Sequence, residues 1–122
     1  MKPETPSVTI GNATFSVEVA RTSEEQRRGL GYRDTLCESC GMLFLFERSE
    51  KMGFWMKGMR FPIDILWIRD GTVVHIERAV SHTDQQTVYT PQEPADSVFE
   101  VNAGMSDRYQ IHIGSTVSFH GM

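Results

Sequence analysis

Apolar and polar residues alternate along residues 15–19, and this period of two predicts a β-strand with one buried face. The β-rich run 8–10 precedes it, and Gly11-Asn12 between the two runs suits a tight hairpin turn. Longer apolar stretches predict central strands of a sheet at residues 42–46, 53–57 and 61–69. The chain is therefore expected to begin with a hairpin and to continue into the middle of a sheet.

A second hairpin is predicted at Asp70-Gly71, because this pair joins two β-rich runs. In the run that follows, His75 is expected on the solvated face, away from its apolar neighbours. Further short strands are predicted at residues 98–101 and within 111–119, with a turn at Gly114-Ser115.

Two overlapping capping-box patterns within residues 22–26 predict the start of a short helix. The helix is expected to run from about Glu24 to Leu30, with Gly31 as its C-terminal cap. Residues 103–110 predict a second short helix. Residues 81–95 are polar and contain two prolines, which indicates a long excursion.

These elements predict a mainly β fold (or a β-rich α+β fold): a small antiparallel β-barrel or a strongly curved sheet with one or two short helices. The first helix is expected to cover one open end. With 122 residues, one domain is expected over residues 7–122, after a flexible tail at residues 1–6.

Charge and hydropathy narrow the class of protein. The net charge is -4 and the charges are interspersed, so a nucleic acid is not an expected partner. No apolar run reaches the roughly 18 residues that span a bilayer, so no transmembrane segment is expected. The polar N-terminus lacks the apolar region of a secretory signal, so a cytoplasmic location is expected, or an extracytoplasmic one if a leader has been removed.

An ordered series of motifs runs through nearly the whole chain: Gly29-Leu-Gly-Tyr-Arg33, Gly41-Met-Leu-Phe-Leu-Phe46, Phe54-Trp-Met-Lys57, Pro62-Ile-Asp-Ile65, Phe99-Glu-Val-Asn-Ala-Gly104 and Ile113-Gly114. In order and spacing this series resembles the family named domain of unknown function 192. The resemblance implies a compact β-barrel-like domain with one or two short helices, and it implies no known reaction. The chain departs from the family pattern at Gly31, Gly58-Met59 and Ser115.

Asp64 lies in an apolar run, where a carboxylate must find a cation or several hydrogen-bond donors. Arg33, Lys57 and Arg60 are its candidate partners. One interpretation is a buried structural ion pair. The other, our leading functional hypothesis, is a non-enzymatic binding domain whose polar site for a small ligand or a protein segment is formed by Arg33, Trp55, Lys57, Asp64 and Glu100.

An enzymatic alternative uses Asp64 and Glu100 as the acid and base of a hydrolase. The sequence provides neither their separation nor a nucleophile. It therefore favours a protein that is not an enzyme.

Cys37 and Cys40 have the spacing of half a zinc knuckle, and a closed zinc site needs four ligands. A disulfide or two free thiols is the structural interpretation, and a redox-responsive loop is a further alternative. Copper is a second metal candidate, because soft sulfur ligands are also available nearby at Met52, Met56 and Met59. We expect no cofactor, with zinc or copper at these cysteines as the alternative.

Overall fold

The computed structural model describes residues 5–122. Its main element is a seven-stranded sheet in the order β6-β5-β8-β3-β2-β1-β9, and β4 pairs separately with β7. The strands are β1 (Ser7–Ile10), β2 (Ala13–Ala20), β3 (Cys40–Glu50), β4 (Phe54–Trp55), β5 (Ile63–Arg69), β6 (Thr72–Val80), β7 (Val88–Tyr89), β8 (Ala95–Asn102) and β9 (Val117–His120). The helices are α1 (Ser23–Arg28) and α2 (Met105–Arg108). No helix in this described part is long and apolar enough to cross a membrane.

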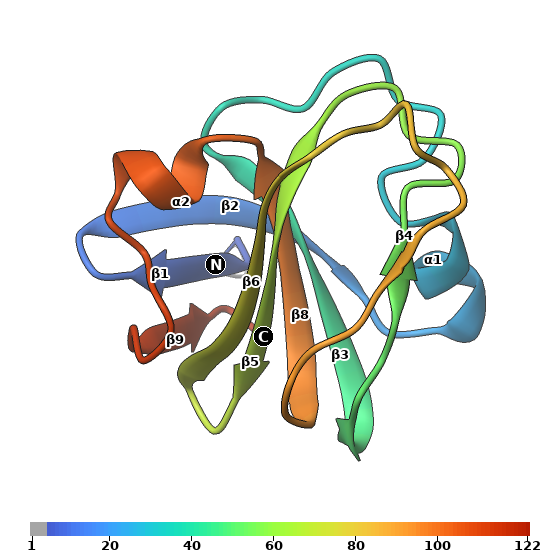
Figure 1. The fold of residues 1–122 in the computed structure, drawn as a ribbon. Coiled ribbons are helices and arrows are strands. Elements are labelled where there is room, and N and C mark those ends of the chain that lie inside the picture. Colours follow the sequence, from blue (N-terminus) through green and yellow to red (C-terminus); the bar gives the residue numbers. More distant parts are fainter. Residues whose placement is uncertain (1–4) are drawn as a thin grey trace.

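The sheet is strongly curved, because β1, β2 and β9 run across the direction of β3, β5, β6 and β8 (Figure 1). Its two edge strands approach each other where Thr72, the first residue of β6, forms an isolated bridge with Thr116, the residue before β9. The fold is therefore a half-barrel. A strongly curved sheet with short helices is confirmed, and the closed barrel is wrong, because β6 and β9 do not pair along their lengths.

Local sequence signals place both hairpins as predicted. The turn between β1 and β2 uses Gly11 at φ +60°, and the turn between β5 and β6 uses Asp70 and Gly71 at φ +50° and +72°. The predicted tail at residues 1–6 lies mostly outside the described residues.

Helix α1 starts with the predicted capping box, in which Thr22 and Glu25 bond each other's backbone N–H groups. The predicted C-cap was wrong: the helix ends at Gly29, which has φ +49° and donates its N–H to the carbonyl of Glu25. A side chain at Gly29 would also approach the ring of Phe44 to 3.3 Å. Gly29 thus lets α1 end close against the sheet.

Residues 53–57 do not form the central strand that was predicted. Only Phe54 and Trp55 are extended, and they pair with β7 from the polar excursion. The ring of Phe54 packs on Phe44 of β3 at 4.9 Å and on Trp67 of β5 at 6.0 Å between centroids. The segment is apolar because it covers the sheet, and not because it lies within it.

His75 was expected in solvent, and this is wrong. It lies opposite Trp67 in the β5–β6 pair, its ring centroid is 5.2 Å from the Trp67 ring, and its side chain is 13% exposed. The ladder shifts register between Trp67 and Ile68. That irregularity breaks the simple alternation from which the solvated face was inferred.

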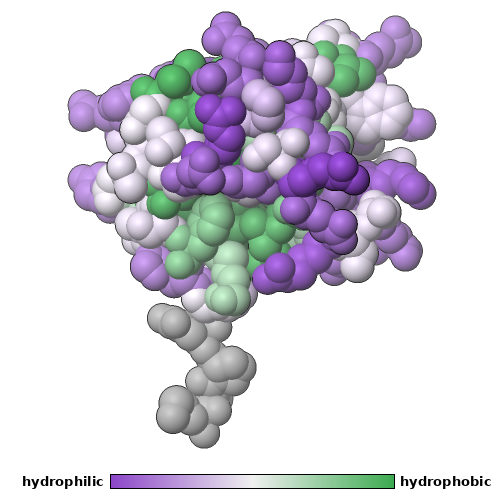
Figure 2. Space-filling model, turned by 90° about the horizontal axis from the view of Figure 1, so that it is seen from below, coloured by the Kyte–Doolittle hydropathy of each residue, from purple (hydrophilic) through white to green (hydrophobic). Residues whose placement is uncertain are grey.

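The sheet separates two hydrophobic cores. The first core fills the curve of the half-barrel and contains Phe15, Leu43, Leu66, Phe99 and Val101. The second core lies on the opposite face, where α1 and β4 cover it, and contains Leu30, Phe44, Ile65, Trp67 and Val98. The molecular face in Figure 2 is mostly hydrophilic, and its largest apolar area lies below the centre.

Candidate functional site

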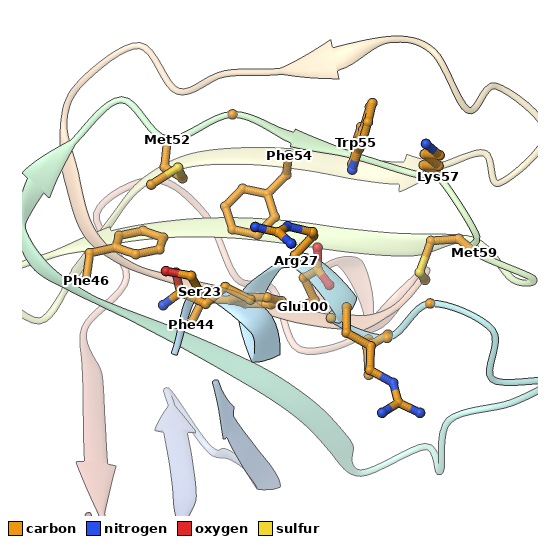
Figure 3. Close-up of a pocket in the computed structure, with 16 residues that line it drawn as sticks. Ser23, Arg27, Phe44, Phe46, Met52, Phe54, Trp55, Lys57, Met59 and Glu100 are labelled. Carbon is orange, nitrogen blue, oxygen red and sulfur yellow. The ribbon is translucent and has the colours of Figure 1, made fainter. Parts of the chain in front are cut away.

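A cavity of about 290 Å³ lies over the second core, between the end of α1 and the segment that carries β4. One part of its wall consists of aromatic and thioether side chains from β3 and the segment that carries β4 (Figure 3). These are Phe44, Phe46, Met52, Phe54, Trp55 and Met59. Such a surface offers apolar and π contacts to a bound molecule.

The segment that carries β4 can lie close to β7 because the residue just before β4 is Gly53, which has no side chain. A Cβ atom at Gly53 would come within 2.6 Å of the side chain of Val88, so a larger residue would require Val88 or the β4 segment to shift. The pairing of Trp55 with Val88 then holds Trp55 at the edge of the cavity, where its side chain is 48% exposed.

Glu100 contributes a buried carboxyl to this cavity. It lies on β8 opposite Met42 of β3 and Ile65 of β5, and it is 4% exposed. Within residues 5–122 its carboxyl has no hydrogen-bond partner, and burial alone raises its pKa to about 8. Glu100 is therefore mainly protonated at neutral pH.

Three cationic side chains also line the cavity. Arg27 and Arg28 come from the last turn of α1, and Lys57 follows β4 with its Nζ 5.1 Å from the centroid of the Trp55 ring. The ion pairs within residues 5–122 involve none of these three cations. Trp55, Lys57 and Glu100, three of the five predicted site residues, are thus brought together.

Asp64 lies elsewhere and is fully buried. Its Oδ1 accepts hydrogen bonds from the N–H of Ala79 (2.7 Å) and the N–H of Gly104 (3.3 Å). Its Oδ2 accepts from the N–H (2.9 Å) and the hydroxyl (2.6 Å) of Ser106. Four donors satisfy this carboxylate without a cation, so the expected polar site around Asp64 is not formed.

The cations expected beside Asp64 have other contacts. Arg33 forms a two-bond ion pair with Glu18, whose pKa is lowered by the hydrogen bond from Arg33. Arg33 and Glu18 line a separate hollow of about 240 Å³. Arg60 pairs with Asp34 at 2.8 Å. Arg33 and Arg60 each pair with an exposed carboxylate, which costs less desolvation than pairing with a buried one.

Asp64 and Glu100 also cannot work as an acid and base pair. Asp64 lies opposite Val101, which belongs to the first core, whereas Glu100 lies opposite Ile65, which belongs to the second core. Directly paired residues share a face of the sheet. The two carboxyls therefore point to opposite faces, and the two-carboxylate hydrolase was wrong.

The sequence did not single out Phe44, Phe46 or Arg27 as site residues, and it named Met59 only as a possible copper ligand. The run 42–46 is apolar on both faces, which indicates that other segments pack on both sides of this strand. Arg27 carried no such signal, since a basic residue in the last helical turn is ordinary complementarity to the helix dipole.

Cys37 and Cys40 form a disulfide just before and at the start of β3. The side-chain amide of Asn102 donates to the carbonyls of Leu36 (2.9 Å) and Cys37 (3.2 Å), which fastens this loop to the end of β8. Across residues 5–122, no three His, Cys, Asp or Glu side chains gather in a metal-binding group. Met52 and Met59 line the cavity, whereas Met56 is fully buried.

Comparison with known proteins gives a family and a fold. The family model described as "Uncharacterized ACR" (DUF192) matches residues 6–119. A crystal structure of a protein of unknown function from Novosphingobium aromaticivorans DSM 12444 is similar, with 32% identity, a TM-score of 0.87, and coverage of 92% of this chain and 83% of that chain. A "putative transcription regulator" from Sinorhizobium meliloti 1021 has 29% identity, a TM-score of 0.88, and coverage of 100% and 98%. A search of the curated proteins found no match.

Proposed function

The chain belongs to the DUF192 family of uncharacterized proteins, and within that family we propose that it is a non-enzymatic binding domain that holds a small, largely apolar ligand. The ligand site is the cavity over the second core. Its volume of about 290 Å³ lies near the lower end of the range for small-molecule pockets, so the ligand is smaller than a typical drug.

The observation that carries this proposal is the Glu100 carboxyl, which lies at the wall of a partly aromatic cavity, belongs to a residue that is 4% exposed, and forms no hydrogen bond within residues 5–122. Among residues 5–122, the fully buried side-chain atoms without a partner are His75 Nδ1 and His82 Nδ1, so the Glu100 oxygens face the cavity and are within reach of a ligand. A ligand that hydrogen-bonds with this carboxyl also covers the exposed ring surface of Trp55.

The residues that line the cavity favour binding over catalysis. Within residues 5–122, the lining provides one carboxyl and includes neither an imidazole nor a thiol. An acid and base pair needs two titratable groups within hydrogen-bond reach. Lys57 is the other such group of the lining, and no ion pair joins it to Glu100 within residues 5–122.

The test uses a neutral fluorescent probe, N-phenyl-1-naphthylamine, which reports an apolar site without adding charge. We expect one probe molecule per chain with enhanced fluorescence. Trp55→Ala should weaken binding about tenfold, because it removes an aromatic wall worth about 1.4 kcal/mol.

Phe119→Ala is the matched control, since Phe119 is an exposed aromatic residue on β9 and does not line the cavity. This variant should bind the probe like the unmodified protein. Absence of probe binding, or equal binding by Trp55→Ala, would contradict the proposed function.

A further inference from the structure

The charges around the cavity indicate which kind of small molecule it takes. The inference rests on the proposed function and deepens it: we infer that the ligand is a small organic anion with an apolar or aromatic body, and that the Glu100 carboxyl donates a hydrogen bond to its carboxylate-type group.

The cavity is cationic although the chain as a whole is acidic. The net charge is -4, yet the lining includes three cations and one carboxyl. Elsewhere in residues 5–122 arginines are commonly neutralised, as by Glu18, Asp34, Glu93 and Asp107. Arg27, Arg28 and Lys57 have no such partner among the described ion pairs. Their combined field attracts an anion.

Glu100 is suited to this ligand because it is mainly protonated. Its strand neighbours Met42 and Ile65 do not titrate, and the other charged groups at the cavity are the three cations. Burial raises its pKa to about 8, so at neutral pH it has an O–H group to donate. A hydrogen bond from an acid O–H to a carboxylate is among the strong, charge-assisted ones.

The side chains of the cavity place a cation and the Glu100 carboxyl where the anionic group of a bound ligand can meet both. Figure 3 shows the guanidinium of Arg27 and the carboxyl of Glu100 near the middle of the group, with Trp55 and Lys57 towards one edge. The rings of Phe44 and Phe54 lie alongside. An aromatic or short apolar body can contact these rings while its anionic group meets Glu100 and a cation.

A cationic ligand fits the same cavity poorly. It would require Glu100 to lose its proton in a desolvated position, and it would face three like charges. A neutral alcohol could hydrogen-bond with Glu100 but would gain nothing from the cations. The order of preference is therefore carboxylate, then alcohol, then amine.

Three probes with one apolar body test this order: 3-phenylpropionate, 3-phenylpropan-1-ol and 3-phenylpropylamine. Binding is followed by the backbone amide NMR signals of the cavity residues at about pH 6.5, below the pKa of Glu100. The carboxylate should bind about tenfold more tightly than either of the others.

The possible results separate this inference from the proposed function. If the alcohol or the amine binds the cavity as tightly as the carboxylate, the inference is overturned while the binding function stands. If none of the three compounds binds but the neutral fluorescent probe does, the inference is again overturned and the binding function stands. If neither the three compounds nor the fluorescent probe binds, both proposals fail.

The role of the Glu100 proton has its own measurement. Between about pH 6.5 and about pH 9, the affinity for 3-phenylpropionate should fall about tenfold, because the donor is lost as Glu100 ionises. Glu100→Gln keeps an N–H donor and cannot titrate in this way, so its affinity should be the same at both values. An unchanged affinity in the unmodified protein, or the same tenfold fall in Glu100→Gln, overturns the inference.

A direct titration keeps the test decisive if Glu100→Gln does not fold. The carbon NMR signal of the Glu100 carboxyl reports its pKa, which bound 3-phenylpropionate should raise further. A pKa that is unchanged or lowered by the probe contradicts donation by Glu100. Lys57→Gln should weaken binding of the probe several-fold, whereas Arg48→Gln, which removes an exposed arginine outside the cavity, should leave it unchanged.

Discussion

Asp64 and Glu100 are two buried carboxyls on adjacent strands of one sheet, and their surroundings differ completely. Asp64 faces the first core and accepts four hydrogen bonds, whereas Glu100 faces the second core and has no partner within residues 5–122. Burial is therefore not what distinguishes a structural carboxyl from a candidate binding group. The number of donors that the fold directs at the carboxyl makes the difference.

The donors to Asp64 come from irregular backbone at two places far apart in the sequence. Ala79 has φ +49° near the end of β6, and Ser106 lies in α2 after Gly104 at φ +94°. Arg78 then donates to the Ser106 hydroxyl at 2.9 Å and to the carbonyl of Ile111 at 2.8 Å. The Asp64 carboxylate thus ties α2 and the end of β6 to the sheet.

The largest expected effect comes from Asp64→Asn. An asparagine amide would direct N–H donors at backbone N–H groups and leave buried donors unpaired, so the free energy of unfolding should fall by about 3–5 kcal/mol. Urea unfolding measures this. Asp34→Asn, at an exposed position, is the control and should cost less than about 1 kcal/mol. A loss that small for Asp64→Asn would remove the contrast between the two carboxyls.

Glu100→Gln should change how stability depends on pH. The folded-state pKa of Glu100 is raised from 4.5 to about 8, so this carboxyl binds a proton on folding within that window. Stability that is present below the unfolded pKa is lost as the pH rises through the folded pKa. Relative to Glu100→Gln, the unmodified protein should lose about 1.4 kcal/mol per pH unit between these limits.

Unfolding of both proteins in urea at about pH 5 and about pH 8 tests this slope. We expect the difference in free energy of unfolding to change by a few kcal/mol in favour of Glu100→Gln at the higher pH. Parallel pH profiles would show that Glu100 is solvated or paired in solution.

The smallest effect is expected for Arg33→Gln. The Arg33 and Glu18 side chains are 36% and 57% exposed, and such ion pairs contribute less than about 1 kcal/mol. The effect should add to that of Asp64→Asn in the double variant, because the hydrogen-bond partners of Arg33 and Asp64 in the described residues are different. A coupling free energy above about 1 kcal/mol in a urea-based double-mutant cycle would restore the predicted link between Arg33 and Asp64.

Short-range features of the fold were predictable because adjacent residues encode them. Gly11-Asn12 and Asp70-Gly71 favour their turns in any context, and Thr22 with Glu25 caps a helix by itself. The segment 53–57 shows the limit of such reasoning. An apolar run packs equally well within a sheet or across it, and composition does not distinguish the two.

The sequence by itself determined the family, the mainly β class, the two hairpins and the presence of one buried carboxyl, Asp64, in an apolar run. Only the tertiary structure decided which face each carboxyl occupies and which groups it meets. The reason is physical. Adjacent strands place neighbouring residues on opposite faces, and the donors to Asp64 and the walls around Glu100 come from segments distant in the chain. The site predicted around Asp64 is replaced by one around Glu100, which retains Trp55 and Lys57.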